Sequence, residues 1–282
     1  MDIKNINTIS FQGIKGANSH LACAKLFPKA KSIPCETFEE VFDSVRINKS
    51  NIGLIPVENS VAGRVAEIHS LMHKTPLKIV GEYFMKIELH LLGVKKIKIN
   101  QIKKVKSHIH ALSQCRKFIK KNKMKMIIAA DTALAAREVR EENNPRESAI
   151  ASKLAAKTYG LEIARENVQD MKHNTTRFLI MSKNLQQKKE DNISYLTSCV
   201  FEVRSVPSAL YKALGGFATH GVNLTKLESF IVEGDFNKAQ FYIDIDGHIE
   251  DKSVKGALEE LDFYTDKLIV LGVYPMHGYR NQ

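Results

Sequence analysis

Long apolar runs and a secretion signal are both missing from this 282-residue sequence. The longest apolar stretch, around Met124 to Ala130, falls well short of the roughly 20 residues that a helix needs to span a bilayer. The first residues of the chain also lack the charged, apolar and small-residue order of a secretory signal. We therefore expect a soluble cytoplasmic protein that does not bind membranes.

Cysteine is scarce, and its spacing excludes two kinds of site. The four cysteines, Cys23, Cys35, Cys115 and Cys199, are far apart and form no C-x-x-C pair, so they predict neither a disulfide framework nor a zinc site. We expect buried free thiols. The glycine fingerprint of dinucleotide-binding proteins is also missing, which disfavours a dehydrogenase. The sequence thus predicts no metal ion and no cofactor.

Positive charge is abundant, with 42 Lys and Arg against 31 Asp and Glu and a formal net charge of +11. Many lysines lie between Lys95 and Lys125, where they alternate with apolar residues at helix and strand spacing. Phe118 is the only Phe, Tyr or Trp in this segment, too few to stack on successive bases, so we interpret the segment as a solvated face and expect no nucleic-acid partner. The charge would still attract an anionic substrate.

Predicted strands and helices alternate up to about Lys183, which indicates an α/β fold. The first set pairs Thr8 to Phe11 with Ser19 to Phe27, Ser32 to Pro34 with Phe38 to Asn48, and Ile52 to Pro56 with Arg64 to His73. A long strand-like segment, Leu77 to Val94, separates it from a second set: Val105, Ala111 to Lys121, Met126 to Ala130, Thr132 to Glu142, and a helix over Ala149 to Tyr159 that ends at Gly160. Two sets imply two lobes. Segments near Gly81 and near Asp170 are the expected crossings, with a ligand cleft between the lobes.

The C-terminal third has a different order. Residues Ser182 to Asn192 are polar and unperiodic, which is typical of a linker. After them we expect strand Tyr195 to Val203, helix Ser208 to His220, strands Asn223 to Val232 and Lys238 to Ile245, helix Lys252 to Leu261 and strand Lys267 to Tyr274. This βαββαβ order is that of ferredoxin-like folds.

Two strand-to-helix turns carry candidate ligand groups. The turn from Phe11 to Ser19 contains two glycines, and Ser19 could cap a helix or donate to a bound carboxylate. The turn from Pro56 to Arg64 brings together Asn59, Ser60 and a charge at the end of a strand. Helix capping by Asn59 or Ser60 explains the second turn equally well.

The segment Asn174 to Ile180 runs polar residues directly into a strand that looks buried. A buried arginine needs a partner, and either a bound anion or a structural carboxylate such as Asp170 would serve Arg177. If the strand begins at Thr175, alternation places Thr176 and Phe178 on one face and Arg177 on the other. Thr176 and Arg177 could then share a cleft only at an irregular strand end.

Together these segments resemble prephenate dehydratase over nearly the whole chain. The resemblance lies in Phe11-Gln12-Gly13 with Gly16-Ala17 and Ser19, Pro56 to Val65, Gly81-Glu82, Ser107-His108 with Ala111-Leu112, and Thr176-Arg177-Phe178. The C-terminal third is similar to an ACT domain, in Ala209 to Leu214 and in Asn223 to Ser229. The sequence departs from the family at Ile109 and His110, to which we assign no role, and at Ser208 and Phe230-Ile231 in the ACT region.

The resemblance implies a two-lobed, periplasmic-binding-protein-like catalytic region in residues 1–182, with lobe one at about 1–80 plus 170–182 and lobe two at about 81–169. A linker at 183–193 and an ACT domain at 194–282 would follow. The implied catalytic residues are Thr176, as the main one, with Arg177 and Phe178. Arg177 would pair with the pyruvyl carboxylate of the substrate. Substrate would contact the residues Ser19, Asn59, Ser60 and Thr175.

The implied reaction is the decarboxylating dehydration of prephenate to phenylpyruvate in L-phenylalanine biosynthesis, with feedback inhibition by phenylalanine. The inhibitor would bind the ACT residues Ala209, Leu210, Asn223, Leu224, Glu228 and Ser229 in a homodimer or homotetramer. Two alternatives stay open: an arogenate dehydratase, and a non-catalytic sensor of aromatic acids.

Overall fold

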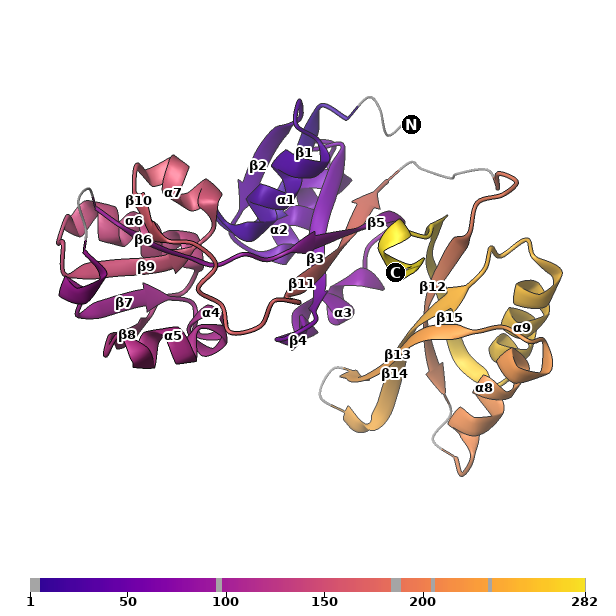
Figure 1. Cartoon of the computed structure of the whole chain (residues 1–282). Coiled ribbons are helices and arrows are strands. Elements are labelled where there is room, and N and C mark those ends of the chain that lie inside the picture. The colour runs from indigo at the N-terminus through magenta and orange to yellow at the C-terminus, as the bar shows by residue number, and fades with distance from the viewer. Residues whose placement is uncertain (1–5, 95–97, 184–188, 204–205, 233–234, 282) are drawn as a thin grey trace.

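The computed structural model of the chain describes residues 6–94, 98–183, 189–203, 206–232 and 235–281. The structure has three parts, which lie in a row (Figure 1). We call them, in their order along this row, lobe two, lobe one and the C-terminal unit. Lobe one contains β1 (Thr8–Gln12), α1 (Asn18–Leu26), β2 (Lys31–Cys35), α2 (Phe38–Arg46), β3 (Ile52–Asn59), β4 (Gly63–Arg64), α3 (Ala66–Met72), β5 (Lys78–Lys86) and β11 (Thr175–Ser182). Lobe two contains β6 (His90–Gly93), β7 (Lys104–Ser107), α4 (Ile109–Gln114), α5 (Arg116–Lys121), β8 (Lys125–Ile128), α6 (Thr132–Glu142), β9 (Glu147–Ala151), α7 (Lys153–Tyr159) and β10 (Glu162–Arg165). The C-terminal unit contains β12 (Tyr195–Val203), α8 (Ala209–Thr219), β13 (Leu224–Val232), β14 (Asp235–Asp246), α9 (Lys252–Phe263) and β15 (Thr265–Pro275).

The C-terminal unit has the expected βαββαβ order, and its sheet continues into that of lobe one. The order of this sheet is β13-β14-β12-β15-β5-β11-β3-β1-β2. Strands β15 and β5 pair in parallel at Gly272 and Ile79. A Cβ at Gly272 would lie 2.1 Å from the Ile79 carbonyl oxygen, so only glycine permits this approach. At the start of α8, Ser208 has a φ of 65°, in the left-handed region that favours glycine.

Helices cover one face of the C-terminal sheet, and lobe one covers the other. Phe201 and Ile243 pack with α8 and α9, whereas Tyr242 and Tyr274 join the core that contains α2 and α3. Because one apolar core spans lobe one and the C-terminal unit, the two parts are packed together rather than merely tethered.

Lobe two has its own sheet, β10-β6-β9-β7-β8, and the chain crosses between the lobes twice. The outward crossing follows Lys86, and the return crossing precedes Thr175. The Ile87 amide donates to the Asn174 carbonyl at 2.8 Å, so the two crossings lie side by side. The crossing expected near Gly81 was misplaced, because Gly81 lies inside β5 opposite Ile180. The segment Leu77 to Val94 has the pattern of one long strand. Nothing in this pattern indicates that β5 joins the sheet of lobe one and β6 the sheet of lobe two.

The helix predicted over Ala149 to Tyr159 is wrong in its first part. Residues Glu147–Ala151 form β9, an entirely buried strand between β6 and β7. The helix begins only at Lys153, after Ser152 accepts a hydrogen bond from the Ala155 amide at 3.0 Å. A short buried run of small residues has no periodicity that distinguishes a strand from a helix. The position of this run between β6 and β7 therefore determines that it is a strand.

Two further segments bear on the predictions. The helix expected over Ala111 to Lys121 is divided at Cys115 into α4 and α5. The expected linker lies partly outside the described residues, since 184–188 are among those left out. All four cysteines are buried and free, as expected.

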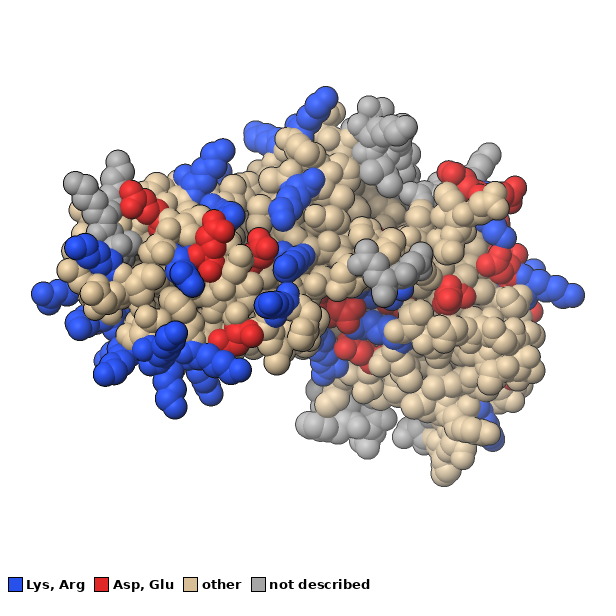
Figure 2. All heavy atoms as spheres, viewed as in Figure 1, with Lys and Arg blue, Asp and Glu red and all other residues tan. Residues whose placement is uncertain are grey.

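The basic segment of lobe two is a solvated face, as predicted. Most of its described cationic side chains project outward while Ile119 and Met124 are buried, and Figure 2 shows lysine and arginine gathered over this lobe. Lys106 is the exception, because it is buried and paired with Glu142 and Glu147. The exposed cations are Lys98, Lys103, Lys104, Arg116, Lys117, Lys120, Lys121, Lys123 and Lys125. None of the helices in the described ranges is long and apolar enough to span a membrane.

Candidate active site

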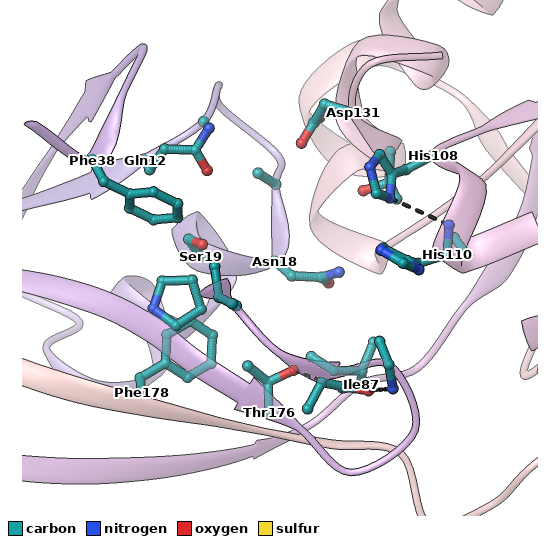
Figure 3. Close-up of a pocket in the computed structure, with 18 of the residues that line it drawn as sticks. Gln12, Asn18, Ser19, Phe38, Ile87, His108, His110, Asp131, Thr176 and Phe178 are labelled. Carbon is teal, nitrogen blue, oxygen red and sulfur yellow. Dashed lines mark hydrogen bonds between the residues drawn. The ribbon is translucent and has the colours of Figure 1, made fainter. Parts of the chain in front are cut away.

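An open cleft of about 1470 Å³ lies between the two lobes. Lobe one contributes the ends of β1, β2 and β3 and the start of α1, and lobe two contributes the starts of α4 and α6. Figure 3 shows Ser19, Thr176 and Phe178 across this space from His108 and Asp131. Polar groups from segments far apart in the sequence therefore meet around one space, which is the usual form of a small-molecule site.

Strand β11 directs Thr176 and Phe178 into the cleft, as the alternation predicted. Both residues line it, and Arg177 between them does not. Phe178 is 1% exposed and forms part of the apolar wall, whereas Thr176 is half-buried at the surface of the cleft. The strand thus presents one hydroxyl to a bound ligand beside an aromatic ring.

The Thr176 hydroxyl is oriented by Asn59. Two backbone amides, those of Val61 and Ala62, donate to Asn59 Oδ1 at 2.9 and 2.8 Å, so the amide nitrogen of Asn59 must point the other way. This nitrogen donates to Thr176 Oγ1 at 2.9 Å and to Asn174 Oδ1 at 2.7 Å. Because Thr176 Oγ1 accepts from Asn59, its own hydrogen is free to donate into the cleft.

The same chain of hydrogen bonds reaches lobe two. Asn174, 1% exposed, donates from Nδ2 to Gln114 Oε1 of α4 at 2.7 Å. The Thr176 hydroxyl is therefore connected by hydrogen bonds to residues of both lobes. Asn174 and Gln114 both line the cleft, but neither was predicted to bind substrate. Asn174 belongs to the polar segment before β11, which the sequence analysis singled out. Gln114 belongs to no sequence motif, and only the fold brings it to the cleft.

The expectation that Ser60 and Thr175 bind substrate is not supported by their positions. Neither residue is among those that line the cleft. Ser60 Oγ donates to the His173 carbonyl at 2.7 Å and accepts from the Thr175 amide at 2.9 Å. Thr175 Oγ1 accepts from Tyr279 of the C-terminal segment at 3.3 Å. These contacts brace the return crossing between the lobes.

The expectation that Arg177 binds the substrate carboxylate is wrong. Arg177 is 2% exposed and does not line the cleft. Its partners are the carboxylates of Glu82 and Asp244, which do not line the cleft either, and of Glu58, which does. The other prediction, that structural carboxylates pair with Arg177, is correct, but Asp170 is not one of them. Burial alone would lower the pKa of Arg177, yet the surrounding Asp244, Tyr274, Tyr242 and Glu82 together outweigh burial and raise that pKa well above the ordinary value.

Helix α1 opens towards the cleft without a side-chain cap. Its N-cap residue is Ala17, and no acidic residue lies in its first turn, so the first amides are available to an anion. Ser19, 9% exposed, lies in this turn and lines the cleft, as expected. Asn18 also lines it, and its Oδ1 is buried with no hydrogen-bond partner among the described residues. A bound ligand could supply the missing donor.

Two histidines and one arginine supply the basic groups of the cleft. His108 and His110 lie at the start of α4 with ring centroids 5.1 Å apart (Figure 3), and Arg64 lies on β4. Burial, and secondarily the His110 charge, lowers the pKa of His108. Asp131 is occupied as the cap of α6, since Oδ1 accepts from two amides. No group of three metal-ligating side chains occurs among the residues that the structure describes.

The residues expected to bind phenylalanine lie on both faces of the C-terminal sheet. They are Ala209, Leu210, Asn223, Leu224, Glu228 and Ser229. Leu224 packs in the core under α8 and α9, whereas Glu228 Oε2 lies 3.0 Å from Nε2 of the buried His69 in α3. The Ser229 carbonyl accepts a hydrogen bond from Arg64 at 2.8 Å. In the described part of a single chain, the six residues therefore do not surround one pocket.

Comparisons with known proteins show which family this chain resembles. The family model described as prephenate dehydratase matches residues 9–186. The chain is 41% identical over 274 residues to a bifunctional N-acyl-homoserine lactone acylase/prephenate dehydratase of Komagataeibacter europaeus, covering 97% of this chain and 98% of the relative. It is 38% identical over 282 residues to arogenate dehydratase/prephenate dehydratase 1 of Arabidopsis thaliana, covering 95% of this chain and 72% of the relative.

A solved structure extends the likeness to the whole fold. Prephenate dehydratase from Arthrobacter aurescens, solved in complex with L-Phe, has a TM-score of 0.87 and 28% identity to this chain, covering 95% of this chain and 90% of the other. The range that matches the family model includes the segment Thr176-Arg177-Phe178. The chain belongs to the prephenate dehydratase family.

Proposed function

We propose that this chain is a carbon–oxygen lyase that converts prephenate to phenylpyruvate in the biosynthesis of L-phenylalanine. The observation that carries the proposal is the Thr176 hydroxyl, which lines the cleft and accepts a hydrogen bond from Asn59, so that its own hydrogen is left to donate to a ligand. The enzyme must assist a leaving hydroxyl, and a fixed donor at the departing oxygen does this.

In the reaction, the bond between the ring and its carboxylate breaks and CO2 leaves. The electron pair of that bond enters the ring, the bond to the ring hydroxyl breaks, and this oxygen takes up a proton to leave as water. Aromatisation of the ring supplies much of the driving force. A threonine is a weak acid, so Thr176 contributes a positioned hydrogen bond while solvent supplies the net proton.

The cleft also matches the charge and shape of prephenate, a dianion with an apolar ring. The open amides of α1 and Ser19 can receive one carboxylate, and Arg64 with the histidines of α4 supplies basic groups nearby. Phe178 and the apolar wall around it face the ring and exclude water. Shielding from water strengthens the electrostatic contacts that remain.

The test is production of phenylpyruvate from prephenate by the wild-type chain, Thr176→Ala and Thr176→Ser. The serine variant keeps a hydroxyl and should retain much more activity than the alanine variant. Arogenate, tested in parallel, should be used less well than prephenate if the proposal is correct. Binding of prephenate without turnover by the wild-type chain would instead indicate a sensor, and undiminished activity of Thr176→Ala would refute the role of this residue.

We further propose that the C-terminal unit is an ACT domain that binds phenylalanine and inhibits the enzyme. The βαββαβ order and the complex of the Arthrobacter dehydratase with L-Phe support this. Because β13 is an edge strand, pairing with a second chain in a homodimer or homotetramer would bury its free backbone groups and could complete the regulator site. Phenylalanine should lower activity and change the sedimentation profile, and an effect on neither would contradict this proposal.

A further inference from the structure

Arg177 follows Thr176 directly and occupies a buried charge cluster on the opposite side of β11. Its guanidinium uses all three nitrogens. Nε donates to Glu82 at 2.8 Å, Nη1 donates to Asp244 at 2.6 Å and to Glu58 at 3.1 Å, and Nη2 donates to the Tyr274 hydroxyl at 3.1 Å. These partners come from β5, β14, β3 and β15. One side chain therefore connects β11 to four other strands.

The three carboxylates around Arg177 have further cationic and hydroxyl partners. Arg280 and Lys226 join Arg177 as cations that contact Glu58, Glu82 and Asp244, and Lys226 also lies 3.4 Å from Glu228. Both oxygens of Glu82, which has a fully buried side chain, accept hydrogen bonds from Arg280. Asp244 also accepts from Ser198 and Tyr242. A buried ion cluster with each charge paired fixes geometry, and removal of one member is costly.

The ladder between β11 and β3 is irregular beside Thr176, although β11 pairs regularly with β5 from Thr175 to Ile180. On the β3 side the register shifts between Arg177 and Phe178. Such irregularities increase local twist and re-aim side chains. Arg177 lies opposite Glu58 at this shift, and Asn59, the next residue on β3, lies opposite Thr176. The arginine–carboxylate contacts therefore join β11 to β3 where this ladder is irregular.

We propose that Arg177 is a positioning residue for the reaction: anchored on Glu58, Glu82 and Asp244, it sets the twist of β11 that aims the Thr176 hydroxyl at the leaving group. One anchor, Asp244, belongs to the C-terminal unit, so that unit takes part in shaping the catalytic centre. The inference rests on the proposed role of Thr176. A lysine at this position would keep the charge but lose the planar fork that reaches several carboxylates at once.

The test is a double-mutant cycle with Arg177→Lys and Thr176→Ala. Misplacement of a catalytic group by about 1 Å can cost roughly a hundredfold in rate, so Arg177→Lys should lower kcat by about 10- to 100-fold, with KM changed less than about threefold. In the Thr176→Ala background, the same substitution should lower the residual kcat by less than about threefold. This non-additivity distinguishes action through Thr176 from general loss of structure.

Leu261→Ala is the control for loss of stability. Leu261 is fully buried in α9 and packs in the core on the helical side of the C-terminal sheet, so its truncation should lower Tm without lowering kcat in assays well below that Tm. If Arg177→Lys does not fold, Tyr274→Phe removes a single contact of the guanidinium and should lower kcat by a smaller factor without raising KM.

Three outcomes overturn the inference while phenylpyruvate formation by the wild type stands: an unchanged kcat in the folded Arg177→Lys variant, an effect on KM alone, or an equal loss in both members of the cycle. Failure of the wild type to convert prephenate, or full activity of Thr176→Ala, would instead refute the proposed function.

Discussion

Replacement of Asn59 by aspartate reverses one hydrogen bond at the centre of the site. The introduced carboxylate can still accept from the amides of Val61 and Ala62, which donate to Asn59 Oδ1 in the wild type. It has no hydrogen to donate to Thr176 Oγ1, 2.9 Å from the wild-type nitrogen. The threonine hydroxyl must then donate to the carboxylate, and its hydrogen no longer faces the substrate.

The size of this effect follows from the bond that is lost. Removal of one positioned donor from a transition state costs about 10²- to 10³-fold in kcat, or about 2.7–4 kcal/mol. Asn59→Asp should therefore lower kcat by about this factor. KM should change little, because the bond to the departing oxygen develops mainly in the transition state. Protonation of the introduced carboxyl restores a donor, so the variant should regain relative activity as the pH falls.

The assay is steady-state formation of phenylpyruvate between pH 5 and pH 8, with Ser60→Ala as the matched control. Ser60 is adjacent in sequence but outside the cleft, so its variant should keep kcat within about threefold of the wild type. A kcat for folded Asn59→Asp within about threefold of the wild type at pH 8, or a rise in KM with kcat preserved, would refute the assigned orientation of the Thr176 hydroxyl.

Three further predictions concern charge and packing. Burial would raise the pKa of Asp244, but Arg177 and the hydrogen bonds from Ser198 and Tyr242 together outweigh burial and lower that pKa. The stabilisation by Asp244 is therefore complete above its ordinary pKa of about 3.9 and is lost as the pH falls through the folded value. Asp244→Asn should therefore lower Tm strongly at pH 7 and less at pH 3, and a constant difference in differential scanning fluorimetry would contradict this. Gly272→Ala should lower Tm through its clash with Ile79, whereas Gly215→Ala in α8, with open space around it, should raise stability by about 0.5–1 kcal/mol in urea unfolding. With a net charge of +11, kcat/KM for a dianion should fall about two- to tenfold between 50 and 500 mM NaCl with kcat unchanged, and salt-independent kcat/KM would exclude steering.

Local patterns in the sequence determined much of the fold. Alternation of strand and helix signals predicted the two α/β lobes, and the βαββαβ order matches the observed strands and helices. Gly160 ends α7 in the left-handed conformation, as expected for a glycine cap. The period of two in β11 correctly placed Thr176 and Phe178 on the face opposite Arg177, because side-chain alternation is a property of the strand itself.

Only the tertiary structure decided which groups meet across long distances. Nothing near Arg177 in the sequence identifies Glu82 or Asp244 as its partners, 95 and 67 residues away. The same holds for Gln114, which reaches Asn174 across 60 residues. Local periodicity reports which face of an element a side chain occupies, whereas the pairing of strands and the packing of lobes decide what lies opposite that face. The sequence therefore singled out Thr176, whereas only the fold placed Asn59 beside its hydroxyl and the charge cluster on the other face of β11.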